Sequence, residues 1–458
     1  MTLSINRIED LANKNVTVIG AGKTGVSVSM LLSRHGARVM LADTNEDVLE
    51  RNNLPDTVRI RLGPHTDDML KADLIIKSPG IASDVPILQK ARKAQIPVWD
   101  ELELVSLMLD PSKIIAITGT NGKTTTTALV SFILNFAGVS TLTAGNIGVP
   151  ISSIVDRLDT ARVVVLEISS YQLECQRSFK PHIAAVLNLS ADHLERHKTM
   201  DEYQRVKERI FHNQSREDYA ILNHDDMYGQ AMAHHCPSEI IFFSSKYNVK
   251  KGVYADTERF YGFLPDKTFT IRPRLQIPGE HNIENALAAT ACTVLFGIEP
   301  ETVESALAEF PGVRHRLELI GTVNGIHFIN DSKATNVHST IMALKAFHKK
   351  PVWLILGGRG KGASYKPLKK YLYSVKGILL IGEDALTIKK DLGSSAPTVD
   401  CFTIRQAVAY SFSHAKPGDT VLLSPACASF DQYKNFEERG DDFRSRVKSQ
   451  DHHSRQGM

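Results

Sequence analysis

The sequence predicts an α/β protein with three consecutive domains: a Rossmann-like N-terminal domain, a central P-loop-type mononucleotide-binding domain and a Rossmann-like C-terminal domain. Three segments support this prediction, because in each an apolar, β-rich run leads into a glycine-rich turn: VTVIGAGKTG at residues 16–25, IIAITGTNGKT at 114–124 and VWLILGGRGKG at 352–362. They lie about a domain length apart in a chain of 458 residues, which is too long for one ordinary core. We therefore place the domains at residues 1–101, 102–312 and 313–458.

The first domain continues with short apolar runs that end in polar or Gly/Pro turns, RVMLAD, LIIKSPG and IPVWD, as expected of parallel strands alternating with helices. Gly20, Gly22 and Gly25 form G-x-G-x-x-G after the first strand, and Asp43 ends the next one. Alone, this pattern predicts a dinucleotide site, but a helix N-terminus and a ribose-binding acid suit any pyrophosphate-linked nucleoside. A purely structural tight turn is the other alternative.

The central segment TGTNGKT predicts a phosphate-binding loop. Gly119 and Gly122 allow the backbone to turn, and the helix that follows offers unpaired N–H groups to an anion. Lys123 adds a positive charge, and Thr124 supplies the hydroxyl that holds Mg2+ in P-loop proteins. The first glycine position of the full Walker pattern falls on Ile117, so the loop is a shortened variant. A chance GK[ST] triplet is the alternative, but strand, turn and helix occur in the required order.

Two further buried-strand candidates, VVVLEISS and IAAVLNLS, end in polar residues, where ligands of open α/β sheets bind. Glu167 stands in an apolar run, where metal coordination would relieve the cost of an unpaired carboxylate; a solvated Glu167 beyond the strand is the alternative. His193 follows a strand and Lys207 lies on a predicted helix. His193 and His197 have helical spacing, but Glu195 is misplaced for a zinc protease, and we interpret His197 as structural.

Composition excludes several classes of protein. Lys and Arg number 54 against 51 Asp and Glu, and the basic residues are scattered, so nucleic acid is not an expected partner. The start of the chain lacks an apolar run and no stretch reaches the length of a membrane span, which predicts a cytoplasmic protein without membrane insertion. The five cysteines are widely spaced, which favours reduced thiols. The polar tail after Arg444 is predicted to fray or to be disordered.

Four further segments are rich in Asn, Arg, Asp, Lys and Ser at predicted turns or helix starts: PGEHNIENALAA, PGVRHRLE, INDSKATN and LSPACASFDQYKNFEERG. Helix capping accounts for Asn282 and Ser332, but it does not explain why Arg316, Lys333 and the SPACAS run occur together. Taken in order with TGTNGKT and the downstream ExSSxQL, these segments resemble the Mur ligase family over nearly the whole chain. NDSKATN and SPACASFDQYKNFEERG are similar to the members that add D-glutamate.

The resemblance implies an ATP-dependent amide ligase of peptidoglycan precursor synthesis. ATP would phosphorylate the alanyl carboxylate of UDP-N-acetylmuramoyl-L-alanine, the D-glutamate amine would attack the acyl phosphate, and a tetrahedral intermediate would collapse to amide and phosphate. Charge developing in this transfer needs Mg2+ and cationic side chains. The dinucleotide fingerprint would then be a site for the UDP-sugar.

The resemblance also implies roles for particular residues. The expected catalytic residues are Lys123, His193 and Lys207. The expected ATP contacts are Gly119, Thr120, Asn121, Gly122, Lys123, Thr124, Thr125, Asn285, Arg316 and Asp331. Those to the UDP-substrate are Lys23, Thr24, Asp43, Thr44, Ser78, Gly80, Asn146 and His193. Those to D-glutamate are Lys333, Thr335, Lys361, Ser429, Phe430 and Phe436.

Two Mg2+ sites are implied, one at Thr124 and Glu167 and one at His193 and Lys207. Because an amine is a poor ligand for Mg2+, Lys207 would be carbamylated by CO2 to become an oxygen donor. We expect a monomer. The chain departs from the family pattern in two places. Arg359 and Gly360 stand where an acidic residue is common, and Phe430 stands where Leu is frequent, a change of bulk that would tighten the amino-acid pocket.

Three rival interpretations remain at this stage. One is another ligase of the same superfamily, such as the folylpolyglutamate type or a Mur ligase that adds a different amino acid. The second is an NAD-dependent oxidoreductase with an accessory phosphate loop. The third is a non-catalytic nucleotide-binding regulator, in which Glu167, His193 and Lys207 would have no evident purpose.

Overall fold

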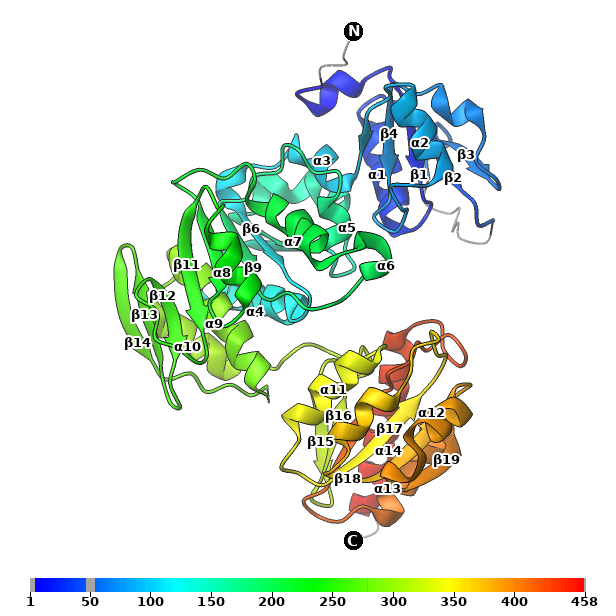
Figure 1. The fold of residues 1–458 in the computed structure, drawn as a ribbon, viewed down its shortest axis with the longest axis vertical. Coiled ribbons are helices and arrows are strands. Elements are labelled where there is room, and N and C mark those ends of the chain that lie inside the picture. Colours follow the sequence, from blue (N-terminus) through cyan, green and yellow to red (C-terminus); the bar gives the residue numbers. More distant parts are fainter. Residues whose placement is uncertain (1–4, 47–53, 278, 457–458) are drawn as a thin grey trace. The chain divides into compact units, whose positions relative to one another are not determined.

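The computed structural model describes residues 5–46, 54–277 and 279–456, with side chains described as far as residue 450. It contains three β-sheets with helices packed on them (Figure 1). The chain divides into two compact units, Met1–Arg274 with Ile283–Glu309, and Leu275–Asn282 with Phe310–Met458. The first two sheets belong to the first unit and the third sheet to the second. Three successive α/β sheets confirm the predicted fold class, while the domain limits at residues 101 and 312 stay predictions.

The first sheet has the strand order β3-β2-β1-β4-β5, and all its pairs are parallel. Its strands are β1 (Asn15–Ile19), β2 (Arg38–Asp43), β3 (Arg59–Leu62), β4 (Leu74–Lys77) and β5 (Val98–Trp99). Its helices are α1 (Lys23–Arg34) and α2 (Pro86–Lys93), and α3 (Glu101–Ser106) follows. One apolar core runs without interruption from Val16 and Leu41 of this sheet to Ala116 of the next, which is why the two sheets form one unit.

The central sheet has the order β14-β13-β12-β11-β10-β9-β6-β8-β7, with antiparallel pairing only where β13 and β14 are added at one edge. Its strands are β6 (Ile114–Thr118), β7 (Thr141–Gly145), β8 (Val163–Glu167), β9 (Ile183–Val186), β10 (Tyr219–Asn223), β11 (Glu239–Ser244), β12 (Gly252–Ala255), β13 (Phe260–Leu264) and β14 (Lys267–Ile271). Its helices are α4 (Lys123–Phe136), α5 (Ser170–Leu173), α6 (Leu194–His197), α7 (Met200–Glu208), α8 (Met227–Ala233), α9 (Glu280–Leu295) and α10 (Pro300–Glu309). Strands β6, β8 and β9 are buried throughout, as expected of parallel strands covered on both faces.

The third sheet has the order β15-β16-β20-β17-β18-β19, antiparallel only between β15 and β16. Its strands are β15 (Glu318–Val323), β16 (Ile326–Asn330), β17 (Val352–Gly357), β18 (Val375–Ile381), β19 (Thr398–Phe402) and β20 (Thr420–Leu423). Its helices are α11 (Val337–Ala346), α12 (Ala385–Leu392), α13 (Ile404–His414) and α14 (Phe436–Gln456). Side chains alternate between two cores: Leu354 and Leu356 pack on the side of α11 and α12, and Ile355 packs on the side of α13 and α14.

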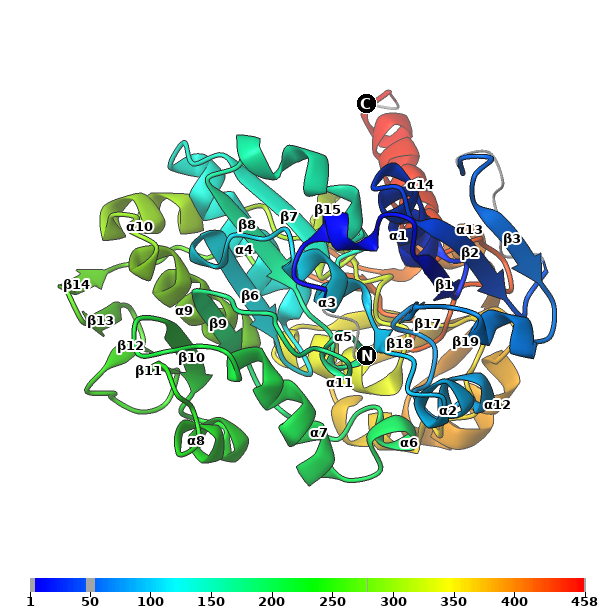
Figure 2. The same cartoon turned by 90° about the horizontal axis from the view of Figure 1, so that it is seen from above.

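One local expectation is wrong. The tail beyond Arg444 does not fray, because α14 continues to Gln456 and buries Phe443 and Val447 against β15, β16 and α13; Figure 2 shows this helix in red. The glycine turn after β17 leads into a 3-10 helix, Lys366–Tyr371, and not into an α-helix as it does after β6. A phosphate-type strand–loop–helix is therefore absent at this point of the third sheet.

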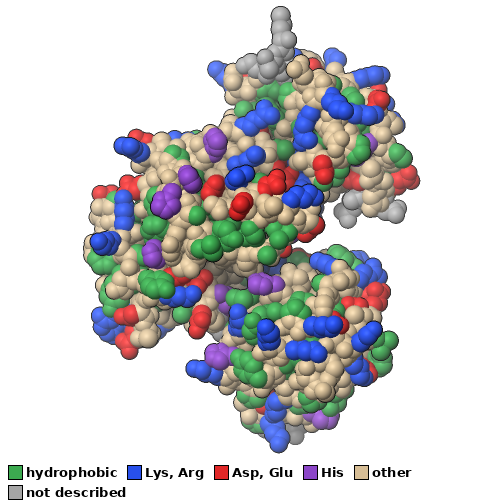
Figure 3. Space-filling model, viewed as in Figure 1, with side chains coloured by type: hydrophobic (Ala, Val, Ile, Leu, Met, Phe, Trp, Pro, Cys, Tyr) green, Lys and Arg blue, Asp and Glu red, His purple; other side chains and the backbone are tan. Residues whose placement is uncertain are grey.

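The surface agrees with the scattered charges of the sequence. On the face drawn in Figure 3, Lys and Arg side chains alternate with Asp and Glu over the described residues. None of the described helices combines the length and apolar character required to cross a membrane.

Candidate active site

The glycine loop at the carboxyl end of β6 has the conformation that the sequence predicted. Gly119 and Gly122 have φ angles of +151° and +82°, which a residue with a Cβ rarely adopts. Segment 188–190 holds the loop: Thr120 N donates to Asn188 O at 2.9 Å and Asn121 N donates to Asn188 Oδ1 at 2.8 Å. The backbone therefore reaches the N-terminus of α4 as a preformed turn, and a helix N-terminus is a place where anions bind.

Asn285, on α9, lies directly against this turn. Its Oδ1 lies 2.2 Å from where a Cβ atom at Gly122 would be, and it accepts a 3.2 Å hydrogen bond from the Thr126 hydroxyl. The predicted ATP-contacting residue Asn285 is thus brought to the loop from a distant part of the sequence. Thr124 is buried at the start of α4, and Thr125 is partly exposed beside it.

Two lysines meet at the base of the loop. Lys123 Nζ donates to Gly119 O and Thr120 O, each at 2.8 Å. Lys207 is 1% exposed, and its Nζ donates to Thr118 Oγ1 at 3.1 Å and Gly119 O at 3.0 Å. Burial, together with the charge of Lys123, lowers the pKa of Lys207 well below its usual value, which favours the neutral amine.

Glu167 ends β8, the strand beside β6, and it is 1% exposed, so the solvated alternative is wrong. Its Oε1 accepts a 2.6 Å hydrogen bond from the Asn146 side chain, whereas its buried Oε2 has no hydrogen-bond partner. A buried carboxylate oxygen without a donor is costly unless a cation binds it. This orphaned oxygen therefore fits the metal ligand that the sequence predicted.

His193 lies at the start of α6 in a left-handed conformation, with a φ of +55°. Its Nδ1 lies 2.8 Å from the Tyr171 hydroxyl, and its ring is partly exposed. The Arg196 guanidinium lies 4.8 Å from the centre of the Tyr171 ring and forms two hydrogen bonds with Glu174. His197 is buried and its Nε2 lies 3.0 Å from Ser170 Oγ, which agrees with the structural role expected for it.

The described residues contain no group of three or more His, Cys, Asp or Glu side chains arranged to hold a metal ion. The donors that the structure offers at this edge of the sheet are the free oxygen of Glu167, the imidazole of His193 and the hydroxyl of Thr124, a set dominated by oxygen that suits Mg2+.

The N-terminal glycine loop is also preformed. Gly20 has a φ of +101°, and a Cβ at Gly25 would lie 1.7 Å from Gly20 O. Ser78 Oγ donates to Gly20 O at 3.0 Å, and Ala21 N donates to Asp43 Oδ2 at 2.7 Å. The predicted UDP-substrate residues Asp43 and Ser78 thus meet at the loop. Lys23, Thr44, Gly80 and Asn146 are exposed, and Thr24 is partly exposed.

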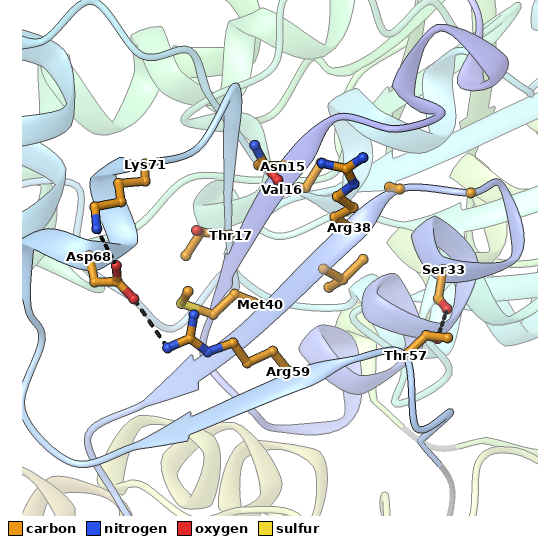
Figure 4. A pocket seen from close by; sticks show the side chains of 13 residues that line it. Asn15, Val16, Thr17, Ser33, Arg38, Met40, Thr57, Arg59, Asp68 and Lys71 are labelled. Carbon is orange, nitrogen blue, oxygen red and sulfur yellow. Dashed lines mark hydrogen bonds and ion pairs between the residues drawn. The ribbon is translucent and has the colours of Figure 1, made fainter.

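Two cavities accompany this sheet. One, of about 670 Å3, lies beside Lys23, between α1 and residues 150–156. The other, of about 600 Å3, is lined by the first residues of β1, β2 and β3, and Figure 4 shows Asp68 between Lys71 and Arg59 there. It lies at the amino ends of the strands, opposite the glycine loop, whereas ligands of parallel sheets bind at the carboxyl ends.

In the second unit, Asp331 follows β16 at the carboxyl edge of the third sheet. It is 7% exposed, and Ser424 Oγ donates to its Oδ2 at 2.8 Å. Burial raises the pKa of Asp331 to about 7, against the opposing effects of the Ser424 hydroxyl and the Arg316 charge. The predicted ATP-contacting residues Asp331 and Arg316 therefore interact electrostatically within this unit.

The residues predicted to contact D-glutamate lie on three loops of the same edge. The Lys333 ammonium is 5.4 Å from the centre of the Phe436 ring, and Thr335 N donates to Lys333 O. Ser429 is buried, whereas Lys361 is exposed. Phe430 is 62% exposed, so within this unit it does not fill a pocket as its bulk suggested.

The two unusual residues after β17 have local explanations. Arg359 forms a bidentate pair with Glu383, with both distances 3.0 Å, and its backbone exchanges hydrogen bonds with Ala428. A Cβ at Gly360 would lie 2.0 Å from Asp384 Oδ2, so glycine leaves room for the Asp384–Tyr365 hydrogen bond.

Sequence reasoning missed several residues that shape these loops. The Asn188 side chain accepts a hydrogen bond from the backbone of the phosphate loop, and the Tyr171 hydroxyl contacts His193. Arg439 is buried among the loops that contain Lys333 and Ser429. The polar end of IAAVLNLS signalled Asn188 in general terms. The buried position of Arg439 gave no signal, because an arginine in a helix that begins FEERG reads as an exposed side chain.

Comparison with known protein families gives three matches in chain order. The Mur ligase MurD-like N-terminal domain matches residues 14–100, the Mur ligase middle domain matches 117–293, and the Mur ligase glutamate ligase domain matches 315–427.

Relatives match over nearly the whole chain. The UDP-N-acetylmuramoylalanine--D-glutamate ligase of Koribacter versatilis is 40% identical over 447 residues, covering 96% of this chain and 98% of the relative. The enzyme of the same name from Anaeromyxobacter dehalogenans is 41% identical over 453 residues, covering 95% and 97%.

Among solved structures, the UDP-N-acetylmuramate-alanine ligase MurC of Thermotoga maritima has a TM-score of 0.61 at 20% identity, covering 95% of this chain and all of that one. A structure of MurF from Acinetobacter baumannii has a TM-score of 0.62 at 19% identity, covering 93% of each chain. At these identities the structures show a shared fold.

Proposed function

The chain belongs to the Mur ligase family, and from this premise we propose that it catalyses the ATP-dependent addition of D-glutamate to UDP-N-acetylmuramoyl-L-alanine in peptidoglycan precursor synthesis. The observation that carries the proposal is the pairing of a preformed phosphate loop at the end of β6 with the orphaned carboxylate oxygen of Glu167 at the end of β8. An anion-binding turn beside an unfilled cation ligand suits a metal-bound nucleoside triphosphate.

In the first step, an oxygen of the alanyl carboxylate attacks the γ-phosphorus of ATP, and ADP leaves with the electrons of the broken P–O bond. The loop amides and the start of α4 hold the phosphates, and the Lys123 ammonium offsets charge on the transferring group. Lys123 already lies against Gly119 O and Thr120 O, so its charge is at the loop before ATP binds.

In the second step, the neutral amine of D-glutamate attacks the acyl carbon. The tetrahedral intermediate expels phosphate, and the nitrogen loses a proton, which leaves the amide. Lys333 and Lys361 offer cationic groups to the two carboxylates of D-glutamate, and Ser429 and Thr335 offer hydroxyls. Phe436 packs against the Lys333 ammonium and limits its freedom.

Mg2+, when bound, would neutralise charge on the ATP phosphates. Thr124 and Glu167 would hold one ion, and His193 with Lys207 the other. The Tyr171 hydroxyl at Nδ1 orients the His193 ring, and Asn146 fixes Oε1 of Glu167, so both donors are held by their neighbours.

Lys207 would contribute as a carbamate. The neutral amine attacks CO2, forms an N–C bond and releases one proton, which replaces a nitrogen donor with a carboxylate-like group. Burial of Lys207 beside Lys123 supports this proposal, because it favours the unprotonated amine that can attack.

The UDP-sugar would bind the first sheet at Asp43 and Ser78, beside the cavity at Lys23. The parallel order 3-2-1-4-5 with a glycine turn after β1 is the arrangement that binds nucleotide pyrophosphates. We further propose that the protein acts as a monomer in the cytoplasm.

The test is phosphate release from ATP and Mg2+ in the presence of UDP-N-acetylmuramoyl-L-alanine, compared between D-glutamate, L-glutamate, L-lysine and no amino acid. Release that depends on D-glutamate supports the proposal. Phosphate release with another amino acid instead would mean that the protein is a ligase of the same superfamily with a different amino-acid substrate. No release under any condition would contradict the proposal.

A further inference from the structure

Arg439 is the largest fully buried side chain among the described residues, with 1% exposure. It lies near the start of α14, and among the described residues Asp431 acts on its charge without forming an ion pair with it. An arginine in such a place needs hydrogen bonds for its N–H groups, since burying a charge without partners is costly.

The hydrogen-bond acceptors for the Arg439 guanidinium lie on two loops, one after β16 and one after β20. Arg439 Nε donates to Ser332 Oγ at 3.0 Å, and Nη2 donates to Ser332 O at 2.8 Å. Nη2 also donates to Cys427 O at 3.1 Å, and Nη1 donates to Ala428 O at 3.2 Å. Ser332 precedes Lys333, and Ala428 precedes Ser429, so one guanidinium ties together the backbone beside two proposed D-glutamate contacts.

A third loop meets the same group. Gly358 has a φ of +136°, and a Cβ there would lie 2.4 Å from Ala428 O and 3.1 Å from Arg439 Nη1. Arg359 then exchanges two backbone hydrogen bonds with Ala428, which fixes the start of the loop that carries Lys361. Phe436 is also connected, because Ser332 Oγ donates to its carbonyl at 2.8 Å.

We infer that Arg439 is a positioning residue for D-glutamate, whose guanidinium fork sets the relative places of Lys333, Ser429 and Lys361. The inference rests on the proposed function. A lysine could not replace the fork, because its three donors share one nitrogen and cannot span both loops. The positive charge of Arg439, which the nearby Asp431 offsets only from beyond ion-pair distance, also favours an anionic ligand at these loops.

The experiment measures KM for D-glutamate and KM for ATP, with the other substrates saturating, in the wild type and in Arg439→Met, Arg439→Lys, Ser332→Ala and Arg446→Met. Arg446 is the matched control: it lies on the same helix and pairs with Asp442 of that helix. Thermal unfolding of each variant shows whether the fold is retained.

We expect KM for D-glutamate to rise about tenfold or more in Arg439→Met and less in Arg439→Lys, while KM for ATP and the values of Arg446→Met stay near those of the wild type. Ser332→Ala, which removes one acceptor, should raise KM for D-glutamate about threefold, and it decides the question if Arg439→Met does not fold. A D-glutamate KM that changes no more than in Arg446→Met, or that rises only in step with the ATP KM, would overturn the inference. A wild type without D-glutamate-dependent turnover would instead overturn the proposed function on which it rests.

Discussion

Oδ1 of Asn285 occupies the space beside Gly122 that a Cβ atom would need, with a separation of 2.2 Å. Gly122 also has a φ of +82°, so a side chain there meets both strain and a clash. Gly122→Ala should therefore displace Asn285 or the loop and lower kcat/KM for ATP about 100-fold, equivalent to ~2.7 kcal/mol.

Gly138→Ala is the control for that variant. Gly138 follows the same helix, α4, and has a φ of +76°, but open space surrounds its Cβ position. It should cost stability of about 1–2 kcal/mol through backbone strain and leave ATP kinetics unchanged. Equal kinetic losses in both variants would show that the contact between Asn285 and Gly122 has no part in ATP binding.

Glu167→Gln should separate stability from activity. Because the buried carboxylate has one oxygen without a donor, its neutral amide should raise the unfolding temperature of the metal-free protein. The same change should lower kcat on the order of 100-fold and raise the Mg2+ concentration for half-maximal activity. Glu101→Gln is a matched control, since Glu101 is equally buried but bonded to Ser152. A Glu167→Gln enzyme with normal Mg2+ dependence would remove Glu167 from the metal site.

Carbamylation of Lys207 predicts a covalent label. After incubation with 13C-bicarbonate, carbon NMR should show a protein-bound carbamate signal that is absent in Lys207→Arg and retained in Lys77→Arg. Lys77 is a matched control, because it is equally buried but its Nζ lies 3.4 Å from a carboxylate oxygen of Glu174, in an ion pair that Lys207 lacks. The Lys207→Arg enzyme should also lose most of its activity. A signal unchanged in Lys207→Arg would contradict the carbamate.

Asp331 should make stability depend on pH. Its pKa is raised to about 7 by burial, so the folded state holds a proton that the unfolded state releases near pH 4. The stability that this proton provides is complete below pH 4 and is lost as pH rises through about 7. Asp331→Asn, which cannot ionise, should therefore gain stability relative to the wild type between pH 5 and pH 8, measured by the unfolding temperature.

Asp419→Asn should behave in the opposite way. Burial raises the pKa of Asp419, but hydrogen bonds from Lys376, the Lys416 backbone and Trp353 outweigh it and lower the pKa below its usual value. The stability that the Asp419 carboxylate contributes is present above pH 4 and is lost as the pH falls below it. The asparagine variant should therefore be less stable than the wild type at neutral pH. If the two variants followed the same pH trend, the assignment of a proton to buried Asp331 would be wrong.

The sequence was sufficient to predict the elements whose patterns are local. Val, Ile and Leu runs followed by glycine turns located β1, β6 and β17, and the polar residue after an apolar run located Glu167. Contacts between segments that are distant in the sequence could not be predicted, because Asn188 and Asn285 approach the phosphate loop only when those segments fold together. The prediction that the tail frays failed for a related reason. Most of the residues of α14 are polar, so the sequence did not show that Phe443 and Val447 are buried against the third sheet.

The most direct test of the proposed reaction measures whether an oxygen atom of the alanyl carboxylate is transferred to inorganic phosphate. UDP-N-acetylmuramoyl-L-alanine with 18O in both oxygens of the alanyl carboxylate should react with ATP and D-glutamate to give inorganic phosphate that carries one 18O atom, with the other retained in the amide. This outcome requires the carboxylate to attack phosphorus before the amine attacks carbon. Phosphate without 18O would mean that water took the phosphoryl group, and it would contradict the ligase mechanism.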